Sequence, residues 1–548
     1  MWWLILFSIT STQAQVTDIA EARKLRSGTM VTVAGRVTAG REFGDLAFMQ
    51  DRTGGIAVYN AQLDRGDSVI VRGKISRFNE MVEIIPDSVR KAGPTKEVLP
   101  GEVLLRYVFE HEGELVTVKR VSLKPPNHFF YPQRGGLLLS ASDTLNYWVD
   151  GDTDIPGCTI PSTPVSVTGI VGRFKDQLQI LPRSKEDIPG MLPFVNIIEP
   201  GTFSVMNWNV EFFGAERYGP SNDELQLENV SKLIAELQPA VVALQEVSGD
   251  KAFRDLIARL PGYAGRCSNR YSYSFDTSGD FPPQKLCFIY QKQVVKVVGE
   301  KVLFRKYYDE HPDVVDIFSS GRLPYLLEAD ILDERVYLVN YHGKSGDGAS
   351  DLKRRELDAR LLNDTLQQYY PGKKLMILGD FNDDVDMSIV KDRPTPYSVL
   401  RYKCLSRDLS DENWHSTISY NDVIDHQFVS KEMEDDWVST RLVNPFALIG
   451  RYGATTSDHL PVFSQFQWKV KTGIKEENEV KIFPIPANDV LNVEGAASFE
   501  YHIFTATGSC VSKGSASRQI TLDIPPGLYK VIINKGPVSQ AFTFIRSD

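Results

Sequence analysis

The sequence has little cysteine, no long apolar run and no excess of positive charge. Its 548 residues include five cysteines, too few for a disulfide scaffold: Cys158, Cys267, Cys287, Cys404 and Cys510. No apolar stretch reaches the roughly 18 residues that a membrane-spanning helix needs. The formal charge of −10, from 61 Lys+Arg and 71 Asp+Glu, argues against a protein that holds nucleic acid by bulk positive charge.

Length and composition indicate a multidomain globular protein. At roughly 100 to 200 residues per domain, 548 residues predict three to five folding units. An apolar share of 42% and an aromatic share of 10% exclude disorder as the main state of the chain. Cys267 and Cys287 fit a bridge between two neighbouring strands, and they fit two unrelated buried thiols equally well.

The first residues have the pattern of a secretory signal peptide. An apolar stretch from Trp2 to Ile9 precedes small polar residues, and Thr12 and Ala14 stand where signal peptidase would cleave after Ala14. The stretch lacks the usual Lys or Arg before it, so a buried N-terminal strand or helix is the alternative. We expect residues 1–14 to be a signal peptide and the protein to be secreted.

The next region contains an internal duplication. The segment Gly73–Phe78 recurs 96 residues later as Gly169–Phe174, with Gly, Arg and Phe at the same places. Both copies show short strands with alternating apolar residues, broken by Gly and Asp turns. We predict two tandem β-barrels, at residues 15–100 and 101–190, that resemble the oligonucleotide/oligosaccharide-binding (OB) fold.

The charge of these barrels does not favour nucleic-acid binding. Residues 16–100 contain 13 Lys+Arg and 11 Asp+Glu, and residues 101–190 contain 9 and 11. Single-strand binding uses a basic groove with stacking aromatics. Phe78 and Phe174 are equivalent in the duplication, and a repeated aromatic in a barrel is more often part of the core. We expect spacer or weak substrate-binding modules, with nucleic-acid contact as the less favoured interpretation.

Residues 202–468 alternate apolar strands with amphipathic helices, which predicts an α/β domain. One helix is expected from about Ser221 to Pro239 and a second over residues 352–370. The second helix is expected to turn four leucines inward: Leu357, Leu361, Leu362 and Leu366.

Polar side chains end several strands of this domain. Asn209 and Glu246 close two apolar strands, and His342 closes a third. Asp380 and Asn382 follow a fourth strand in the motif Gly-Asp-Phe-Asn, where a spacing of two places both side chains on one side of an extended segment. Because α/β sheets present catalytic groups at the carboxyl ends of their strands, these residues are expected to converge.

Two acid–imidazole motifs complete the set. Asp425 lies in Ile-Asp-His, and Asp458 precedes His459 in Ser-Asp-His. Each motif alone is weak, because such residues usually serve as turns, caps or structural groups. Together, their order resembles the endonuclease/exonuclease/phosphatase superfamily, which includes deoxyribonuclease I, exonuclease III, sphingomyelinases and inositol-polyphosphate 5-phosphatases. The resemblance covers residues 202–468 and implies a four-layer α/β sandwich.

The resemblance implies a magnesium site. Glu246, helped by Asn209 and Asp458, would bind Mg²⁺, a hard ion that takes oxygen ligands, with Mn²⁺ or Ca²⁺ as alternatives. The sequence has no Cys/His ligand cluster, which argues against structural zinc.

The resemblance also implies catalytic roles. His459 would act as general base on the attacking water, with Asp425 fixing its tautomer. Asp380 and Asn382 would position the water and the phosphate, and His342 would stabilise charge on the phosphoryl oxygens. Whether Asp380 or the His459 pair takes the proton of the water stays open at this point.

The charge of this domain bears on its substrate. It holds 30 Lys+Arg and 40 Asp+Glu, so long DNA should bind it weakly at physiological salt. Arg322 lies in Gly-Arg-Leu-Pro, where many relatives carry an Arg near the phosphate, and Lys344 is a second nearby cation. The expected phosphate contacts are Arg322, Asn382 and His342.

The C-terminal region resembles a different family. From Phe483 the chain reads Phe-Pro-Ile-Pro-Ala-Asn-Asp-Val-Leu-Asn-Val, and a Pro-Gly-Leu-Tyr motif follows at 526–529. These motifs resemble the type A sorting domain of the type IX secretion system, a small β-sandwich that carries cargo across the outer membrane. We expect a linker at 469–480 and this domain at 481–548, with the secretion machinery as its partner.

These expectations combine into a secreted, Mg²⁺-dependent phosphodiesterase, with an extracellular endonuclease acting on nucleic acid as the favoured form. A second reading is a sphingomyelinase-like phospholipase C or a phosphomonoesterase, for which residues 444–450 offer an apolar loop, although a covered strand connection fits better. A third interpretation is a non-catalytic surface binding protein. The complete set of candidate catalytic residues argues against it: Glu246, Asp380, Asn382, Asp458 and His459. No stable membrane insertion is expected.

Overall fold

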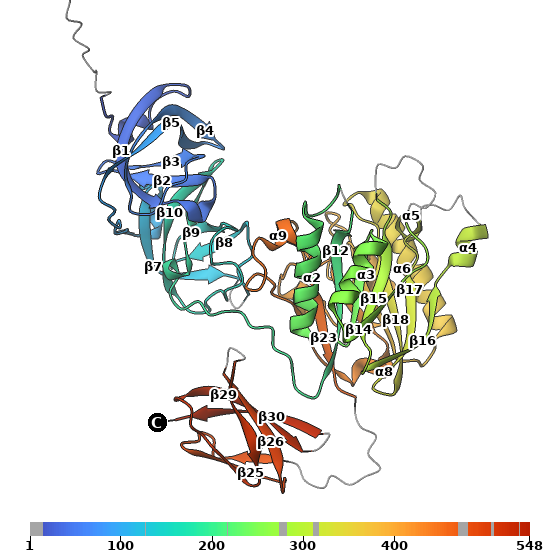
Figure 1. Ribbon diagram of the computed structural model, residues 1–548. Coiled ribbons are helices and arrows are strands. Elements are labelled where there is room, and N and C mark those ends of the chain that lie inside the picture. The colour runs from blue at the N-terminus through green and yellow to red at the C-terminus, as the bar shows by residue number, and fades with distance from the viewer. Residues whose placement is uncertain are drawn as a thin grey trace, which may run out of the picture. The chain divides into compact units, whose positions relative to one another are not determined.

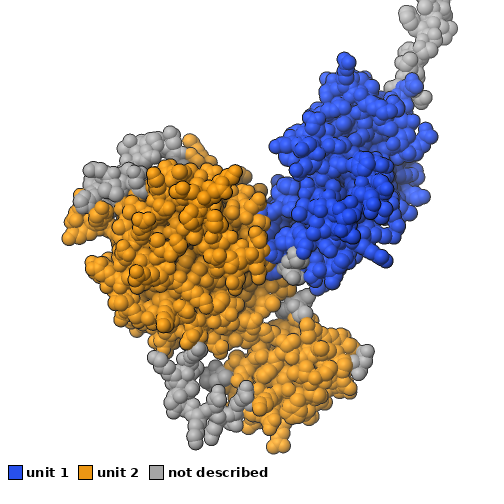
Figure 2. Space-filling view, turned by 180° about the vertical axis from the view of Figure 1, so that it is seen from behind, with its two compact units in different colours: residues 1–194, 444–451 blue, residues 195–443, 452–548 orange. Residues whose placement is uncertain are grey.

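The chain is described by a computed structural model (Figure 1), which divides into two compact units (Figure 2). Unit 1 comprises residues 1–194 and 444–451, and unit 2 comprises residues 195–443 and 452–548. The described residues are 15–125, 128–215, 217–272, 282–310, 317–468, 480–505, 509–535 and 538–547. The predicted signal peptide and nearly all of the predicted linker lie outside them. None of the described helices combines the length and apolarity needed to cross a membrane.

The first half of unit 1 is a closed barrel. A short helix, α1 (Ile19–Ala22), precedes it, and a 3-10 turn, η1 (Arg41–Phe43), follows its first strand. The strands pair in the order β1-β2-β3-β5-β4 and close through β1 and β4. They are β1 (Met30–Ala39), β2 (Leu46–Gln50), β3 (Gly55–Tyr59), β4 (Ser68–Phe78) and β5 (Met81–Gly93).

The second half repeats this strand order. The sheet runs β10-β11-β9-β8-β7-β6, and an additional pairing of β10 with β7 joins the first five strands into a ring. In the first copy β3 pairs with β5 in parallel, and in the second copy the equivalent strands β9 and β11 do the same. The duplication seen in the sequence is therefore present in the topology. The elements are β6 (Gly101–Val103), η2 (Leu105–Glu110), β7 (Leu115–Lys124), β8 (Arg134–Leu139), β9 (Thr144–Val149), β10 (Val165–Phe174), β11 (Gln177–Leu181) and η3 (Lys185–Asp187).

The expectation that Phe78 and Phe174 belong to the barrel cores is wrong. Phe78 is 61% exposed and Phe174 is 48% exposed. Each is the last residue of its strand, at the tip of a hairpin, where alternation along the strand no longer turns a side chain into the barrel.

The apolar segment 444–451 belongs to unit 1. The amide of Asn444 donates to Gly157 O at 2.8 Å, and the ring of Phe446 lies 5.8 Å from the ring of Phe129. This segment is therefore a covered connection rather than a free apolar loop.

Two six-stranded sheets form the α/β part of unit 2. The first runs β14-β15-β13-β12-β23-β22 and the second runs β16-β17-β18-β19-β21-β20. The strands of the first are β12 (Phe203–Phe213), β13 (Val241–Val247), β14 (Tyr263–Cys267), β15 (Lys285–Gln291), β22 (Trp437–Leu442) and β23 (Val462–Phe466). Those of the second are β16 (Val295–Val302), β17 (Tyr325–Ile331), β18 (Glu334–His342), β19 (Leu375–Asp380), β20 (Lys403–Cys404) and β21 (Asp425–Val429).

The two sheets face each other across one apolar core. Val205 and Val241 of the first sheet share this core with Leu327 and Met376 of the second. A second core lies on the other face of the second sheet, where Leu362 packs with its strands. The helices are α2 (Asp223–Leu237), α3 (Asp250–Arg259), α4 (Arg305–Glu310), α5 (Phe318–Gly321), α6 (Ala349–Tyr369), α7 (Arg407–Asp411), α8 (Lys431–Glu434) and α9 (Tyr452–Thr455), with the 3-10 turn η4 (Pro396–Val399). The domain is the layered α/β sandwich that the sequence predicts (Figure 1).

The structure corrects one expectation for this domain and decides one alternative that the sequence left open. Leu357, expected on the inner face of α6, is 45% exposed, whereas Leu362 and Leu366 are buried. Cys267 and Cys287 form a disulfide between the paired strands β14 and β15, which decides the alternative that the sequence left open.

The C-terminal region has two small sheets around its own core. One sheet runs β24-β25-β28 and the other runs β27-β26-β29-β30. Leu491, Ile503 and Val531 are among the residues of the core. The strands are β24 (Lys481–Phe483), β25 (Val490–Glu494), β26 (Phe499–Thr505), β27 (Cys510–Ala516), β28 (Gln519–Thr521), β29 (Gly527–Lys535) and β30 (Val538–Arg546).

Candidate active site

Strand direction brings the predicted residues to one edge of the two sheets. β12 and β13 run parallel, as do β18 and β19, so the carboxyl ends that carry Asn209, Glu246, His342 and Asp380 lie at one edge of their sheets. β21 runs antiparallel to β19, and β23 runs antiparallel to β12. Their amino ends therefore lie at the same edge, where Asp425 begins β21 and His459 precedes β23.

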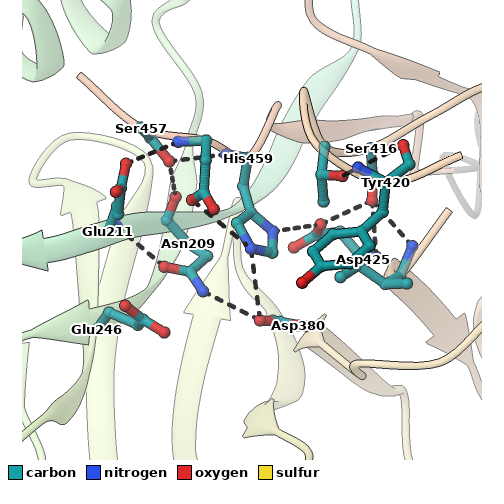
Figure 3. Close-up of polar contacts among 12 residues, drawn as sticks. Asn209, Glu211, Glu246, Asp380, Ser416, Tyr420, Asp425, Ser457 and His459 are labelled. Carbon is teal, nitrogen blue, oxygen red and sulfur yellow. Dashed lines mark hydrogen bonds and ion pairs between the residues drawn. The ribbon is translucent and has the colours of Figure 1, made fainter. Parts of the chain in front are cut away.

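The imidazole of His459 lies between carboxylates (Figure 3). Its Nδ1–H donates to Asp425 Oδ2 at 2.8 Å. Its Nε2 lies 3.9 Å from Asp380 Oδ2 and 3.9 Å from Asp458 Oδ1. Ser416 Oγ donates to the same Asp425 oxygen at 2.8 Å, which holds the carboxylate in place. The hydrogen bond at Nδ1 thus fixes the orientation of the ring, and Nε2 points toward the carboxylates of Asp380 and Asp458.

Asp380 is the polar centre of the site. Its Oδ2 accepts from Asn209 Nδ2 at 3.0 Å and lies 3.2 Å from His342 Nε2. Its Oδ1 accepts from the backbone N–H of Asn382 at 2.8 Å. Asp380 is 1% exposed, so these partners replace the water that a surface carboxylate would have.

The buried groups shift one another's protonation. Burial alone would raise the pKa of Asp380, but the imidazoles of His342 and His459 outweigh it and hold that pKa below its ordinary range. Burial would lower the pKa of His459, and the carboxylates of Asp425, Asp458 and Asp380 raise it well above the ordinary value. Burial raises the pKa of Asp425 to about 6, against the effect of His459.

A second carboxylate group lies beside Asn209 (Figure 3). Glu246 accepts from the backbone N–H of Phe212 at 3.2 Å, and Glu211 accepts from the backbone N–H of Asp458 at 2.9 Å. Burial, Asp458 and Glu246 raise the pKa of Glu211 to about 7. Four carboxyl groups therefore crowd one side of the site: Glu211, Glu246, Asp380 and Asp458.

These donors fit a hard divalent cation. The side chains that gather here offer carboxylate and amide oxygens, as Mg²⁺ requires. Asn209 Oδ1 accepts from Glu211 N at 3.0 Å and keeps a second lone pair. Among the described residues, Asp380, Asp425 and His459 also form a group whose ligand atoms lie within 4.8 Å of one another.

Arg322 supplies the buried positive charge. Its Nη1 lies 2.8 Å from His342 Nε2 and donates to Gln284 Oε1 at 2.9 Å, while Nη2 donates to Gly343 O at 3.1 Å. Burial and the neighbouring guanidinium lower the pKa of His342, against the opposing effect of Asp380. Lys344 pairs with Asp351 at 3.1 Å instead of joining the group.

A glycine permits the close approach of the central strands. Gly379 has φ +150°, and a Cβ there would lie 1.9 Å from Tyr341 O in the neighbouring strand β18. Asp380 and Asn382 follow directly, and Asn382 adopts a left-handed φ of 53°. Its side-chain amide donates to Gly343 O at 3.3 Å.

The structure thus brings together Asn209, Glu246, Arg322, His342, Asp380, Asn382, Asp425, Asp458 and His459. Glu211 and Ser416 were not predicted from the sequence. Glu211 follows Asn209 by two residues at a strand end, which could have marked it. Ser416 lies in a loop and has no recognisable sequence signal.

Two family models match the chain. The Endonuclease/Exonuclease/phosphatase family matches residues 206–459, and the Secretion system C-terminal sorting domain matches residues 481–545. None of the curated proteins matches the chain.

Solved structures resemble about half of the chain. The human Nocturnin catalytic domain with bound sulfate is 19% identical, with 49% of this chain and 94% of that chain covered and a TM-score of 0.37. An endonuclease/exonuclease/phosphatase from Bacteroides vulgatus is 18% identical, with 49% and 99% covered and a TM-score of 0.36. D. rerio TDP2 complexed with a single-strand DNA product is 15% identical, with 48% and 98% covered and a TM-score of 0.35. By the two family models, residues 206–459 belong to the Endonuclease/Exonuclease/phosphatase family and residues 481–545 are a Secretion system C-terminal sorting domain.

Proposed function

We propose that this protein is a secreted, Mg²⁺-dependent phosphodiesterase that hydrolyses nucleic acid as an endonuclease. The observation that carries the proposal is the hydrogen-bonded pair of His459 and Asp425. The second ring nitrogen of His459, Nε2, lies 3.9 Å from Asp380 Oδ2 in a site rich in carboxylates. An imidazole held by a carboxylate on one nitrogen is suited to take a proton on the other.

The chain's own residues account for the proton and the phosphate. His459 Nε2 would take the proton of the attacking water, while Asp425 holds the tautomer through Nδ1. Asp380, fixed by Asn209, would orient that water, and the amide of Asn382 would contact a phosphoryl oxygen. His342 and Arg322 would hold the negative charge of the phosphate as the bond breaks.

Glu246, Asn209 and Asp458 would hold the magnesium ion, and Glu211 would hold the backbone of Asp458 in place by accepting from its N–H. When bound, the ion offsets charge on the phosphate and on the leaving oxygen. A site with this many carboxylates would repel an anionic substrate without a cation, so we expect turnover to depend on the metal.

Nucleic acid is favoured over lipid by the segment 444–451. A phospholipase C needs an apolar loop that reaches the membrane surface. Here Phe446 packs against Phe129 and Tyr131 within unit 1 instead. The C-terminal sorting domain supports delivery to the cell surface or outside the cell by the type IX secretion machinery.

The test is a substrate panel with the full-length protein. Supercoiled plasmid, single-stranded RNA, sphingomyelin vesicles and bis(p-nitrophenyl) phosphate are each incubated with Mg²⁺ and with EDTA. We expect nicking of the plasmid that EDTA abolishes. Cleavage of sphingomyelin without any cleavage of nucleic acid would overturn the proposed substrate.

A matched pair of histidine variants separates the site from contaminating nuclease. His459→Ala should lower plasmid turnover by about 10² to 10⁴-fold, the usual contribution of a general base. His111→Ala, in unit 1 beside Glu114, should retain wild-type turnover. Equal activity in the His459→Ala variant would remove this residue as the base.

A further inference from the structure

Two exposed tyrosine rings stand on loops that border the candidate active site. Tyr420 is 62% exposed and Tyr218 is 37% exposed. Burial of an aromatic ring of this size stabilises a fold, so both rings forgo part of that stabilisation by remaining at the surface. Both are accessible to a ligand, and the loops that carry them fix their positions relative to the catalytic groups.

Tyr420 is held on the His459 side of the site. Thr417 pairs with His459 in an isolated β-bridge, and the backbone N–H of Ile418 donates to Asp458 O at 2.8 Å. The backbone N–H of Tyr420 donates in turn to Thr417 Oγ1 at 2.9 Å. Figure 3 shows the side chain of Tyr420 on this side of the site. The segment that carries the candidate general base therefore also positions the ring.

Tyr218 is held on the Glu246 side of the site. Its ring lies 5.3 Å from the ring of Phe212, and the backbone N–H of Phe212 donates to Glu246 Oε2 at 3.2 Å. The next residue, Gly219, lies so close to the strand end that a Cβ there would stand 2.6 Å from Glu211 O. This aromatic pair therefore borders the carboxylates of the candidate metal site.

The candidate phosphate position lies between the two tyrosines. Asp380 Oδ2 lies 3.9 Å from His459 Nε2 and accepts from Asn209 Nδ2 at 3.0 Å. In Figure 3, Asn209 and Asp380 lie between Glu246 and Asp425. A phosphate beside Asp380 would therefore have an aromatic ring on each side.

Rings on both sides of a phosphate suit a strand whose bases are unpaired. Stacking of one base on an aromatic side chain is worth about 5- to 150-fold in affinity, and every base has a face that can stack. In a duplex both faces of a base are already covered, so the base must first be unstacked. Residues 202–468 contain 30 Lys+Arg and 40 Asp+Glu, so contacts to a duplex backbone offset little of this cost.

We propose that the active site prefers single-stranded to double-stranded nucleic acid, and that Tyr420 and Tyr218 stack on the bases that flank the scissile phosphate. The inference rests on the proposed function, because it names the form of nucleic acid that the phosphodiesterase cleaves. Both tyrosines are then specificity residues, which touch the substrate away from the bond that breaks.

The test compares three substrates of the full-length protein with Mg²⁺. A fluorescent DNA strand without self-complementarity is used alone, as a duplex with its complement, and as an analogue in which abasic tetrahydrofuran units replace all nucleosides. We expect kcat/KM on the single strand to exceed kcat/KM on the duplex and on the abasic strand by about tenfold or more in each case.

The variants assign this preference to the two rings. Tyr420→Ala and Tyr218→Ala should each lower the ratio of kcat/KM between the base-bearing and the abasic strand by about threefold or more, mainly through KM. Tyr420→Phe keeps the ring and should keep the wild-type ratio. Because the ratio compares two substrates of one enzyme preparation, a partial loss of folded protein does not change it.

The matched control is Tyr369→Ala, which should also keep the wild-type ratio. Tyr369 is 67% exposed and ends α6 before β19 begins, so it lies toward the end of β19 opposite to Asp380. Equal or faster cleavage of the duplex, or an unchanged ratio in both alanine variants, would overturn the inference and leave the proposed endonuclease activity standing. Cleavage of none of the three substrates would overturn the proposed function and the inference with it.

Discussion

In the proposed mechanism Asp425 acts through His459. Its Oδ2 accepts from His459 Nδ1 at 2.8 Å and from Ser416 Oγ at 2.8 Å, and the residue is 0% exposed. The negative charge stabilises the imidazolium, so it contributes to the raised pKa of His459. The proposed mechanism therefore makes Asp425 a positioning residue with an electrostatic effect that can be measured.

Asp425→Asn should change the pH profile as well as the rate. A general base works only in its neutral form, so a raised pKa of His459 places the acid limb of kcat/KM at a higher pH. Removal of the Asp425 charge lowers that pKa, and the acid limb should move to lower pH while the plateau falls by about 10² to 10⁴-fold. The measurement is kcat/KM for bis(p-nitrophenyl) phosphate from pH 5 to 9. Ser416→Ala, which keeps the charge, is the control, and an unmoved limb in Asp425→Asn would contradict the assignment.

His426 should make stability depend on pH. It is 0% exposed, with Nδ1 at 2.8 Å from Ser406 Oγ, and burial lowers its pKa to about 4. In the unfolded state His426 binds a proton below a pKa of about 6.5, whereas in the folded state it stays neutral until the pH approaches 4. The free energy of unfolding therefore falls as the pH is lowered from 6.5 toward 4. Between pH 7 and 4.5 the stability advantage of the wild type over His426→Gln should shrink by about 2 to 3 kcal/mol. Urea unfolding at a series of pH values measures this, and a constant difference would count against it.

At the scale of single elements, parallel strand pairs explain why the site exists. β12–β13 and β18–β19 end together at one edge, and their last residues deliver Asn209, Glu246, His342 and Asp380. The edge strand β14 is held by fewer backbone hydrogen bonds than the central strands, because among the described strands it pairs only with β15. The disulfide Cys267–Cys287 compensates for this by joining these two strands.

Loss of this disulfide should lower stability. Its half-cystines are 20 residues apart, and closing a loop of that length stabilises a fold by about 3 kcal/mol through the unfolded state. Dithiothreitol should therefore lower the thermal midpoint of the wild type and leave a Cys267→Ser/Cys287→Ser variant unchanged. Cys510→Ser, an exposed free thiol in the C-terminal region, is the control and should respond to dithiothreitol as the wild type does. An identical midpoint with and without reductant in the wild type would refute the prediction.

At the scale of the whole molecule, separate cores serve separate tasks. The barrels, the α/β domain and the C-terminal sheets each have their own apolar cluster. The core of the C-terminal region contains only residues from Val480 onward. We therefore expect this region, which matches a secretion system C-terminal sorting domain, to be separable from the proposed catalysis.

Removal of residues 480–548 should leave catalysis intact. The candidate active-site residues all lie between Asn209 and His459. We therefore expect kcat/KM on bis(p-nitrophenyl) phosphate to stay within about twofold of the value for the full chain. A twofold change is smaller than the roughly 0.5 kcal/mol that changes at distant sites usually cause. The same truncation should prevent secretion by cells that carry the type IX machinery. A loss of more than tenfold in kcat/KM would show that the sorting domain supports the site.

The sequence by itself determined the α/β domain and most of its site. Apolar runs that end in Asn209, Glu246, His342 and Asp380 are legible without a structure, because strands place their last polar residues at a sheet edge. The tertiary structure alone decided which of these groups meet, that Glu211 and Ser416 join them, and that Leu357, Phe78 and Phe174 face outward. The periodicity of apolar residues indicates which side of a helix or strand is buried. Contacts between distant strands depend instead on how whole sheets pack. The contact between the β4–β5 and β10–β11 hairpin tips, from Lys175 N–H to Asn79 O, likewise depends on how the two barrels pack.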